Sequence, residues 1–349
     1  MTVQILLGGF DITDYLKSGF TYKEYRSLDR DQFIINDLNL RLENLDGLFS
    51  PGNGNYLFEG GNIRGKSLEV LADGVSFWKG VAEKFDEAED SQISTLKAKN
   101  SLALLRNTPI NRTETGVNPA TLALDILRTE VGLDDSEIDI PSFERSATVL
   151  SQGGLLVNAT WTTDKRKTVS KALEELARVS CADFFTTRGK LAFLVYEEGL
   201  GAYSVLIDNT VGEGFKRTGQ ETRYIKNDYV LDYSGSTGET DSDNNNSGEE
   251  SRINFGTDSI SLKYGSSDLL TITTQAGGVF LGDQYIARQA FPKDWIYFSL
   301  PMSVEPNLSL KTPIGVTFPK YGYSGKAFDV MSIQYDFGRQ YYTVGAIEQ

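Results

Sequence analysis

The stretch GGNIRGKS, residues 60–67, fits the phosphate-loop pattern G-x-x-x-x-G-K-[ST] and raises the question of nucleotide binding. A phosphate loop needs a helix that begins at its Lys-Ser pair, so that backbone N–H groups and the helix dipole converge on the phosphates. The residues that follow, LEVLADGVSFW (68–78), instead alternate in period two on both sides of Asp73-Gly74, a dipeptide typical of tight hairpin turns. The stretch therefore predicts the start of a β-hairpin.

One further segment keeps the nucleotide site open as an alternative. LAFLVYEE (191–198) resembles the apolar strand ending in acids that completes such a site. The residues before it, Arg188-Gly189-Lys190, indicate a turn that leads back to Phe184-Phe185. This segment too is therefore interpreted as one arm of a hairpin.

The composition excludes several classes of function. The chain has 349 residues, 40% of them hydrophobic, which is typical of a globular protein with real cores. Its formal net charge of −14 argues against a surface that grips nucleic acid or anionic membrane. One cysteine and no histidine exclude disulfides, Cys/His zinc sites and His-dependent triads, and Cys181 is expected to be a small buried apolar residue.

Targeting signals are not apparent in the sequence. No run approaches the roughly 18 apolar residues of a membrane-spanning helix, so we expect no membrane-spanning segment. The N-terminal MTVQ lacks the basic start of a secretory signal. We expect a protein that is made and kept in a cytoplasm or that leaves it by another route.

The order of patterns along the chain predicts a mainly β protein with an α+β insertion. Leu38, Leu40 and Leu42 alternate with polar residues as in a strand of a β-meander. Asn118-Pro119 indicates a helix start and Gly132 its end. A second helix is predicted from Thr168, with a hairpin from Phe184 to Tyr196 to pack against it.

Strands are expected to return beyond about residue 206, interrupted by one helix over 278–289. The predicted strands carry alternating side chains at Ile260, Leu262 and Tyr264, at Ile296, Phe298, Leu300 and Met302, and at Ile333, Tyr335 and Phe337. The segment STGETDSDNNNSGEE, residues 236–250, has five acids and no base, so it is expected to be a solvated, mobile loop.

These patterns predict three domains. We expect a first tube-like β-barrel over 1–105, a middle α+β domain over 106–205, and a second tube-like β-barrel over 206–349 that carries the acidic loop 236–250. The segments 77–86 and 323–330 echo each other weakly, which suggests that the two barrels are related.

No constellation of residues predicts a chemical site. Asp241, Asp243 and Asn245 begin like a calcium-binding loop, but Asn246 stands where the turn glycine belongs and Arg252 where the closing glutamate belongs. The adjacent acids Glu174-Glu175, Glu197-Glu198 and Glu249-Glu250 could suggest glycosidase carboxylates, yet sequence neighbours do not face each other across a sugar. We therefore expect no catalytic, cofactor-binding or metal-binding residues, and no cofactor.

Several stretches resemble the baseplate hub, or tail hub, proteins of tailed bacteriophages. The first domain of that family is resembled by DITDYL (11–16), LNLRLEN (38–44), DGLFSP (46–51), GKSLEV (65–70) and FWKGV (77–81). The segment 172–196 is similar to the family's middle domain, and 278–348 resembles its closing segment. The acidic loop 236–250 has no counterpart in this resemblance.

The resemblance implies a virion structural protein rather than an enzyme. It implies a homotrimer in which each chain contributes two tube-like β-barrels, so that three chains form a pseudo-sixfold ring matching the hexameric tail tube. Such a ring, assembled in the host cytoplasm, joins the tail tube or a distal tail protein to the central spike or tip, contacts other baseplate proteins, and lets DNA pass through its lumen without specific binding.

Two functions from other classes remain as alternatives. One is a tail-tip enzyme that degrades the cell wall, for which residues 106–205 are the only candidate insert. The other is a carbohydrate-binding β-module, suggested by the aromatic residues, which make up 11% of the chain.

Overall fold

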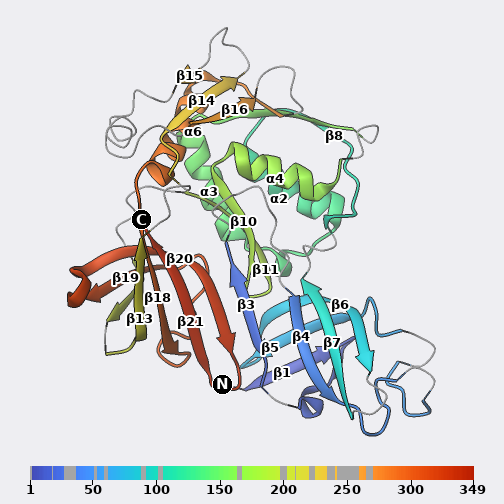
Figure 1. Cartoon of the computed structure of the whole chain (residues 1–349). Coiled ribbons are helices and arrows are strands. Elements are labelled where there is room, and N and C mark those ends of the chain that lie inside the picture. The colour runs from blue at the N-terminus through green and yellow to red at the C-terminus, as the bar shows by residue number, and fades with distance from the viewer. Residues whose placement is uncertain are drawn as a thin grey trace.

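The computed structural model describes most of the chain as two β-sheets beneath a layer of helices (Figure 1). The described residues are 2–17, 19–26, 37–50, 53–58, 62–87, 92–100, 105–162, 167–196, 203–208, 210–219, 225–233, 240–241, 259–264 and 270–349. The acidic loop 236–250 and the candidate calcium ligands Asp243 and Asn245 therefore lie almost wholly outside the described residues, with only 240–241 inside them.

The first sheet, called sheet A, has six strands in the order β2-β1-β5-β6-β7-β4, all antiparallel. Its strands are β1 (Val3–Leu7), β2 (Phe10–Asp11), β4 (Asp37–Glu43), β5 (Ser67–Ala72), β6 (Val75–Glu87) and β7 (Ile93–Asn100). Leu38, Leu40 and Leu42 on β4 are fully buried while the residues between them face outward, as the alternation predicted.

The glycine-lysine stretch opens a hairpin inside sheet A. Strand β5 begins at Ser67 and pairs with β6 across a turn in which Asp73 and Gly74 have φ of 50° and 79°. Positive φ at both central residues is what a type I′ turn requires, and Asp-Gly supplies it at low cost. The predicted hairpin is confirmed, because a strand and not a helix follows Ser67; Gly60 lies outside the described residues.

The second sheet, called sheet B, has seven strands. Its order is β12-β19-β20-β21-β18-β13, with β3 paired to the second half of β20. The strands are β3 (Thr21–Tyr25), β12 (Val205–Asp208), β13 (Glu213–Gly219), β18 (Asp294–Pro301), β19 (Pro313–Phe318), β20 (Tyr323–Asp336) and β21 (Tyr341–Glu348). Strand β3 thus comes from the N-terminal part of the chain but belongs to the C-terminal sheet.

The two sheets repeat one topology. The order β1-β5-β6-β7-β4 in sheet A and β12-β19-β20-β21-β18 in sheet B both run through the first, third, fourth, fifth and second strand along the chain. In the long strands β6 and β20, which begin at Val75 and Tyr323, the bulges toward β7 and β21 fall at Glu83 and Met331, eight residues from each start. The echoing segments 77–86 and 323–330 lie in these two strands. One difference is that β1 pairs antiparallel with β5 whereas β12 pairs parallel with β19.

The helical layer contains α2 (Pro119–Ile126), α3 (Ile140–Gln152), α4 (Val169–Val179) and α6 (Gln275–Gln289). Short strands accompany it: β8 (Arg112–Val117), β9 (Val157–Trp161) and β17 (Leu270–Ile272) form one sheet, β14 (Asp228–Tyr233), β15 (Thr240–Asp241) and β16 (Ser259–Tyr264) another, and β10 (Ala182–Thr187) and β11 (Lys190–Val195) a hairpin. Short helical turns occupy Thr13–Tyr15, Leu127–Val131, Asp135–Glu137 and Pro319–Tyr321.

Local signals place the helix ends. The side chain of Asn118 accepts hydrogen bonds from the backbone N–H groups of Ala120 and Thr121, and Pro119 occupies the first turn of α2. Gly132, with φ of 74°, ends the extension of this helix. Helices α2 and α4 confirm the two helices predicted for the middle of the chain. Helix α6 begins three residues before its predicted start, because the hydroxyl of Thr274 accepts a hydrogen bond from the backbone N–H of Gly277.

Helix α3 was not predicted from the sequence. It buries Ser142 and Ser146 together with Phe143 and Leu150, so polar residues interrupt its apolar stripe. Both serines hydrogen-bond to the edge of β11 that faces away from β10: Phe193 N–H donates to Ser142 at 3.1 Å, and the Ser146 hydroxyl donates to the Phe193 carbonyl at 2.9 Å. Helix α3 therefore supplies hydrogen-bond partners to strand β11 of the hairpin. The apolar pattern of the sequence did not indicate this contact.

The core has two parts. One apolar cluster lies within the helical layer and includes both 105–196 and Leu270, Ile272, Leu281 and Ile286. The other runs continuously through sheets A and B. Residues 270–290 thus pack against the helical layer, although they lie beyond residue 205, where the middle domain was expected to end. The expected domain ranges stay a prediction.

We predict that Gly80→Ala disrupts sheet A. A Cβ at Gly80, on β6, would lie 2.0 Å from the backbone carbonyl oxygen of Lys99 on β7, so the two strands must separate. We expect the free energy of unfolding, measured by urea titration, to fall by about 1–3 kcal/mol. Gly219→Ala is the matched control, because a Cβ there meets nothing within 4 Å. Equal stability of the two variants would contradict this account.

Candidate functional site

The tip of the β10–β11 hairpin is wedged where the two sheets meet. The hairpin runs from the helical layer down to the gap between sheets A and B (Figure 1). Its turn consists of Arg188 and Gly189, with φ of 48° and 71°. A Cβ at Gly189 would lie 3.3 Å from the backbone nitrogen of Lys79 on β6, so the turn touches the backbone of sheet A.

Arg188 connects this turn to both sheets. Its guanidinium lies 5.4 Å from the ring centre of Phe77 on β6, a cation–π contact with sheet A. The same group donates hydrogen bonds to the side-chain oxygen of Asn307, at 3.2 Å, and to the carbonyl of Pro306, which lie in the loop between β18 and β19. One residue of the hairpin therefore contacts both halves of the β-structure.

Aromatic rings continue the contact between the sheets. The ring of Phe77, from sheet A, meets Tyr335 and Phe337, from sheet B, edge to face at 4.5 Å and 5.2 Å. Tyr22 on β3 stacks on Tyr335 at 5.7 Å and meets Trp78 at 6.2 Å. These pairs contribute beyond their buried area and fix the two sheets against each other.

Glu24 is a fully buried carboxylate at the same junction. It accepts hydrogen bonds from the backbone N–H of Arg188 at 2.8 Å and from the hydroxyls of Tyr335 at 2.9 Å, Thr187 at 3.2 Å and Tyr22 at 3.3 Å. Burial raises the pKa of Glu24 from 4.5 to about 7, because desolvation of the charged form outweighs these four donors. The carboxylate thus links β3, the hairpin tip and β20.

A second buried carboxylate, Asp183, is shared by two arginines. Arg26, just after β3, donates from Nε to Asp183 at 2.8 Å and from a second nitrogen to the same oxygen. Arg288 on α6 donates to both oxygens of Asp183 at 3.0 Å and 2.9 Å. The three side chains are at most 8% exposed, so the ion pairs lie out of reach of solvent screening.

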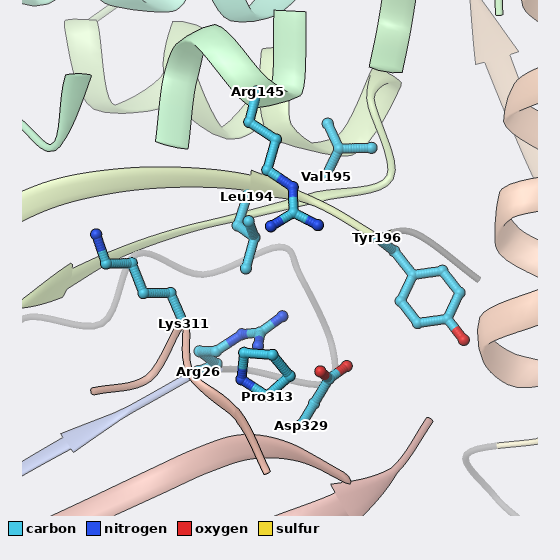
Figure 2. Close-up of a pocket in the computed structure, with 8 residues that line it drawn as sticks. All are labelled: Arg26, Arg145, Leu194, Val195, Tyr196, Lys311, Pro313 and Asp329. Atoms are coloured by element: carbon cyan, nitrogen blue, oxygen red, sulfur yellow. The ribbon is translucent and has the colours of Figure 1, made fainter. Parts of the chain in front are cut away.

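A small cavity opens beside this ion-pair cluster. Figure 2 shows Arg145 from α3 reaching down toward Arg26, with Lys311, Asp329 and Tyr196 around them. Its volume is about 40 Å³. Sites for small-molecule ligands typically enclose roughly 300–1,000 Å³, so this cavity has the size for water or a small ion rather than for an organic substrate.

The structure disperses the residues that the sequence singled out. Lys66 lies over the ring of Phe58 at 5.1 Å, and Ser67 starts β5, so they form no phosphate cradle. Glu174 pairs with Lys171, and Glu175 accepts from Trp161 and Lys167, whereas 197–198 and 249–250 lie outside the described residues. Cys181 is buried, as predicted.

The junction residues Glu24, Arg26, Asp183 and Arg188 were missed. In TYKEYR (21–26) both sets of alternating side chains contain polar groups, so the sequence does not indicate which set is buried. In the structure Tyr22, Glu24 and Arg26 point inward. Most of their partners lie more than 100 residues away in the sequence, for example 157 residues between Arg26 and Asp183, and no local pattern predicts such a pairing.

The described residues offer no conventional metal or membrane feature. Within them, no group of three or more acidic, cysteine or histidine side chains could hold a metal ion. None of the helices in the described ranges has the length and apolar character needed to span a membrane.

Comparison with known proteins identifies the fold. No family profile matches the chain and no curated protein matches its sequence. A tail protein of prophage MuSo2 from Shewanella oneidensis matches with 12% identity over 99% of this chain and 98% of that chain, at a TM-score of 0.57. A tail protein from Neisseria meningitidis matches with 10% identity over 99% and 96%, also at 0.57. The chain has the fold of phage tail proteins.

A third match has the same fold and comes from a secretion system. The E. coli c3393 protein, a type VI secretion system component described as similar to the T4 bacteriophage tail proteins gp27 and gp5, matches with 11% identity and a TM-score of 0.52. The match covers 100% of this chain and 75% of that one. The resemblance to tail hub proteins seen in the sequence is thus confirmed for the fold.

In this tail-protein fold, Asp183→Asn is predicted to be strongly destabilising. It leaves the buried charges of Arg26 and Arg288 without a counter-charge, which typically costs about 3–5 kcal/mol. Glu43→Gln is the matched control, because it breaks the exposed Lys17–Glu43 pair, and such pairs contribute at most about 1 kcal/mol. Urea titration of both variants measures the difference, and similar losses would contradict the assigned role of Asp183.

We further predict that Glu24 makes stability depend on pH. Below pH 4.5 the carboxyl is protonated in both the folded and unfolded states; between 4.5 and about 7 the unfolded chain loses the proton first, so stability falls as pH rises. Glu24→Gln removes this dependence. The difference in the free energy of unfolding between variant and wild type should therefore change by up to about 1.4 kcal/mol per pH unit in this window. Parallel curves from pH 4.5 to 8 would refute the prediction.

Proposed function

We propose that this chain is the baseplate hub, or tail hub, of a tailed bacteriophage. Three copies form a ring of six similar sheets, which joins the tail tube to the central spike or tip. The observation that carries the proposal is the repeated topology of sheets A and B, with bulges at Glu83 and Met331 at the same place in the matching strands. Two equivalent sheets per chain are what a trimer needs to match a sixfold partner.

The ring is expected to be cyclic and head to tail. Within one chain sheet A contacts sheet B, so closing a ring of alternating sheets requires sheet B of one copy to contact sheet A of the next. Such heterologous contacts close when the rotation between copies is 120°. The rigid junction around Arg188 and Phe77 supports this, because a constant angle between the sheets is a condition for closure.

The charge distribution is compatible with passage of DNA. The outer face of sheet A carries opposite charges in pairs, such as Lys79–Glu69, Lys97–Asp86 and Lys99–Glu83. A wall of this kind offers no continuous row of cations to phosphates, whereas a wall with six to ten phosphate contacts would hold DNA tightly. Carboxylates on the wall repel phosphate only within about 8 Å at physiological salt.

The proposed hub acts within the virion tail. Its partners are then a second and third copy of the chain, the tail tube or a distal tail protein, the spike or tip, and other baseplate proteins. In this role the chain is structural and not an enzyme. The alternatives of a cell-wall-degrading enzyme or a carbohydrate-binding module have no specific observation in their favour among the described residues.

The test is the mass and shape of the purified chain. We expect a mass three times that of one chain by light scattering, and threefold ring-shaped particles by electron microscopy, with interfaces of more than about 2,000 Å² per pair. A stable monomer at all concentrations, alone and with its tail partners, would refute the hub. Hydrolysis of ATP or degradation of cell wall by the purified protein would instead favour the alternatives.

A further inference from the structure

Strand β13 is an exposed edge of sheet B. It pairs with β18 on one side, and no described strand pairs with its other side. All of its residues except Phe215 are exposed. An open edge of seven residues is a template for pairing with another strand, and proteins normally cover or interrupt such edges.

Within one chain, strand β3 covers part of the edge of β20 in sheet B. It lies between β1 and β4 in the sequence, and it pairs antiparallel with Ser332–Asp336, the part of β20 beyond the bulge at Met331. Through this strand a segment of the N-terminal part is added to sheet B. Strand β3 is therefore the seam between the two halves of one chain.

Strand β13 has the same place in the chain order as β3, but it also pairs with β18 of its own sheet, whereas β3 pairs with β20 alone among the described strands. Strand β13 lies between β12 and β18, as β3 lies between β1 and β4. The part of β6 beyond its bulge at Glu83 corresponds to the part of β20 that receives β3. On that side β5 pairs no further than Val81, with Lys66 reaching Ala82, and no described strand pairs with 84–87.

We propose that β13 of one copy pairs antiparallel with the 84–87 end of β6 of the next copy, and that this strand seam closes the ring. The inference rests on the proposed trimer and adds the surface through which the copies join. Figure 1 shows β13 at the edge of sheet B that faces away from sheet A, and β6 at the opposite side of the molecule, as a head-to-tail contact requires.

Charge complementarity favours a second copy as the occupant of both edges. Strand β13 carries Lys216 and Arg217 against one acid, Glu213, whereas the end of β6 carries Glu83, Asp86 and Glu87 against Lys84. Neither Lys216 nor Glu87 forms an ion pair with another described residue. Arg217 already pairs with Asp294, and Glu83 and Asp86 pair with lysines on β7. One positive charge on β13 and one negative charge on β6 are thus left to attract each other between copies.

Engineered disulfides test the seam directly. Neighbouring antiparallel residues have Cα atoms about 4.5–5.5 Å apart, within the range that a disulfide spans. Lys216→Cys is combined with Lys84→Cys in one chain and with Asp86→Cys in another, because all three side chains lie on the outer face of their sheets. Mild oxidation should give covalent dimers and trimers on a denaturing gel with at least one combination.

Two controls make the result specific. Lys216→Cys combined with Asn39→Cys, an exposed position on β4, should give no covalent trimer, and the wild-type chain should give none because Cys181 is buried. A wild-type trimer in which neither seam combination cross-links would overturn the seam while the hub stands. A wild-type chain that stays monomeric at all concentrations, alone and with its tail partners, would overturn the hub and the seam together.

Charge reversal is a second test that does not depend on disulfide geometry. Lys216→Glu and Asp86→Lys, which change two charges on the same outer face, should each weaken trimer formation about 2- to 5-fold at low salt, since exposed ion pairs contribute at most about 1 kcal/mol. The double variant should recover part of this loss. A double variant as weak as the sum of the two single changes would count against the seam.

Discussion

The arrangement of the molecule depends on one buried carboxylate, Asp183. It lies on the hairpin of the helical layer, and it is held by Arg26 from the N-terminal part and by Arg288 from α6. Buried ions that are hydrogen-bonded in a fixed geometry tolerate only small displacements, because each displacement weakens bonds that compensate their desolvation. Because all three groups are buried, loss of the carboxylate leaves two positive charges without compensation. This constraint sets the helical layer on the sheets.

The same hairpin sets the angle between the sheets. Its turn places Arg188 against Phe77 of sheet A and against the loop of sheet B at Pro306, and Glu24 ties the turn to Tyr335. Two sheets of one topology are thereby held as a fixed pair. For the hub that we propose, a fixed pair is the repeating unit of the ring, and β13 and β6 would extend the internal seam from one copy to the next.

Local chemistry made much of the fold predictable. Asp73-Gly74 supplies two positive φ angles, Asn118-Pro119 supplies a cap and a fixed first turn, and the leucines of β4 show a period of two. Helix α3 escaped because its buried face contains Ser142 and Ser146, whose role is to complete the hydrogen bonds of β11. A serine that is buried by pairing with a distant strand looks the same in sequence as a serine in solvent.

The sequence by itself determined the hairpin after the glycine-lysine stretch, the helix ends and the mainly β class, because these depend on dihedral preferences and on periods of a few residues. The tertiary structure alone decided that β3 joins the distant sheet and that Glu24 and Arg26 face inward. Those outcomes depend on partners more than 150 residues away. The energy of such contacts exists only once the chain has brought them together, so no local pattern records it.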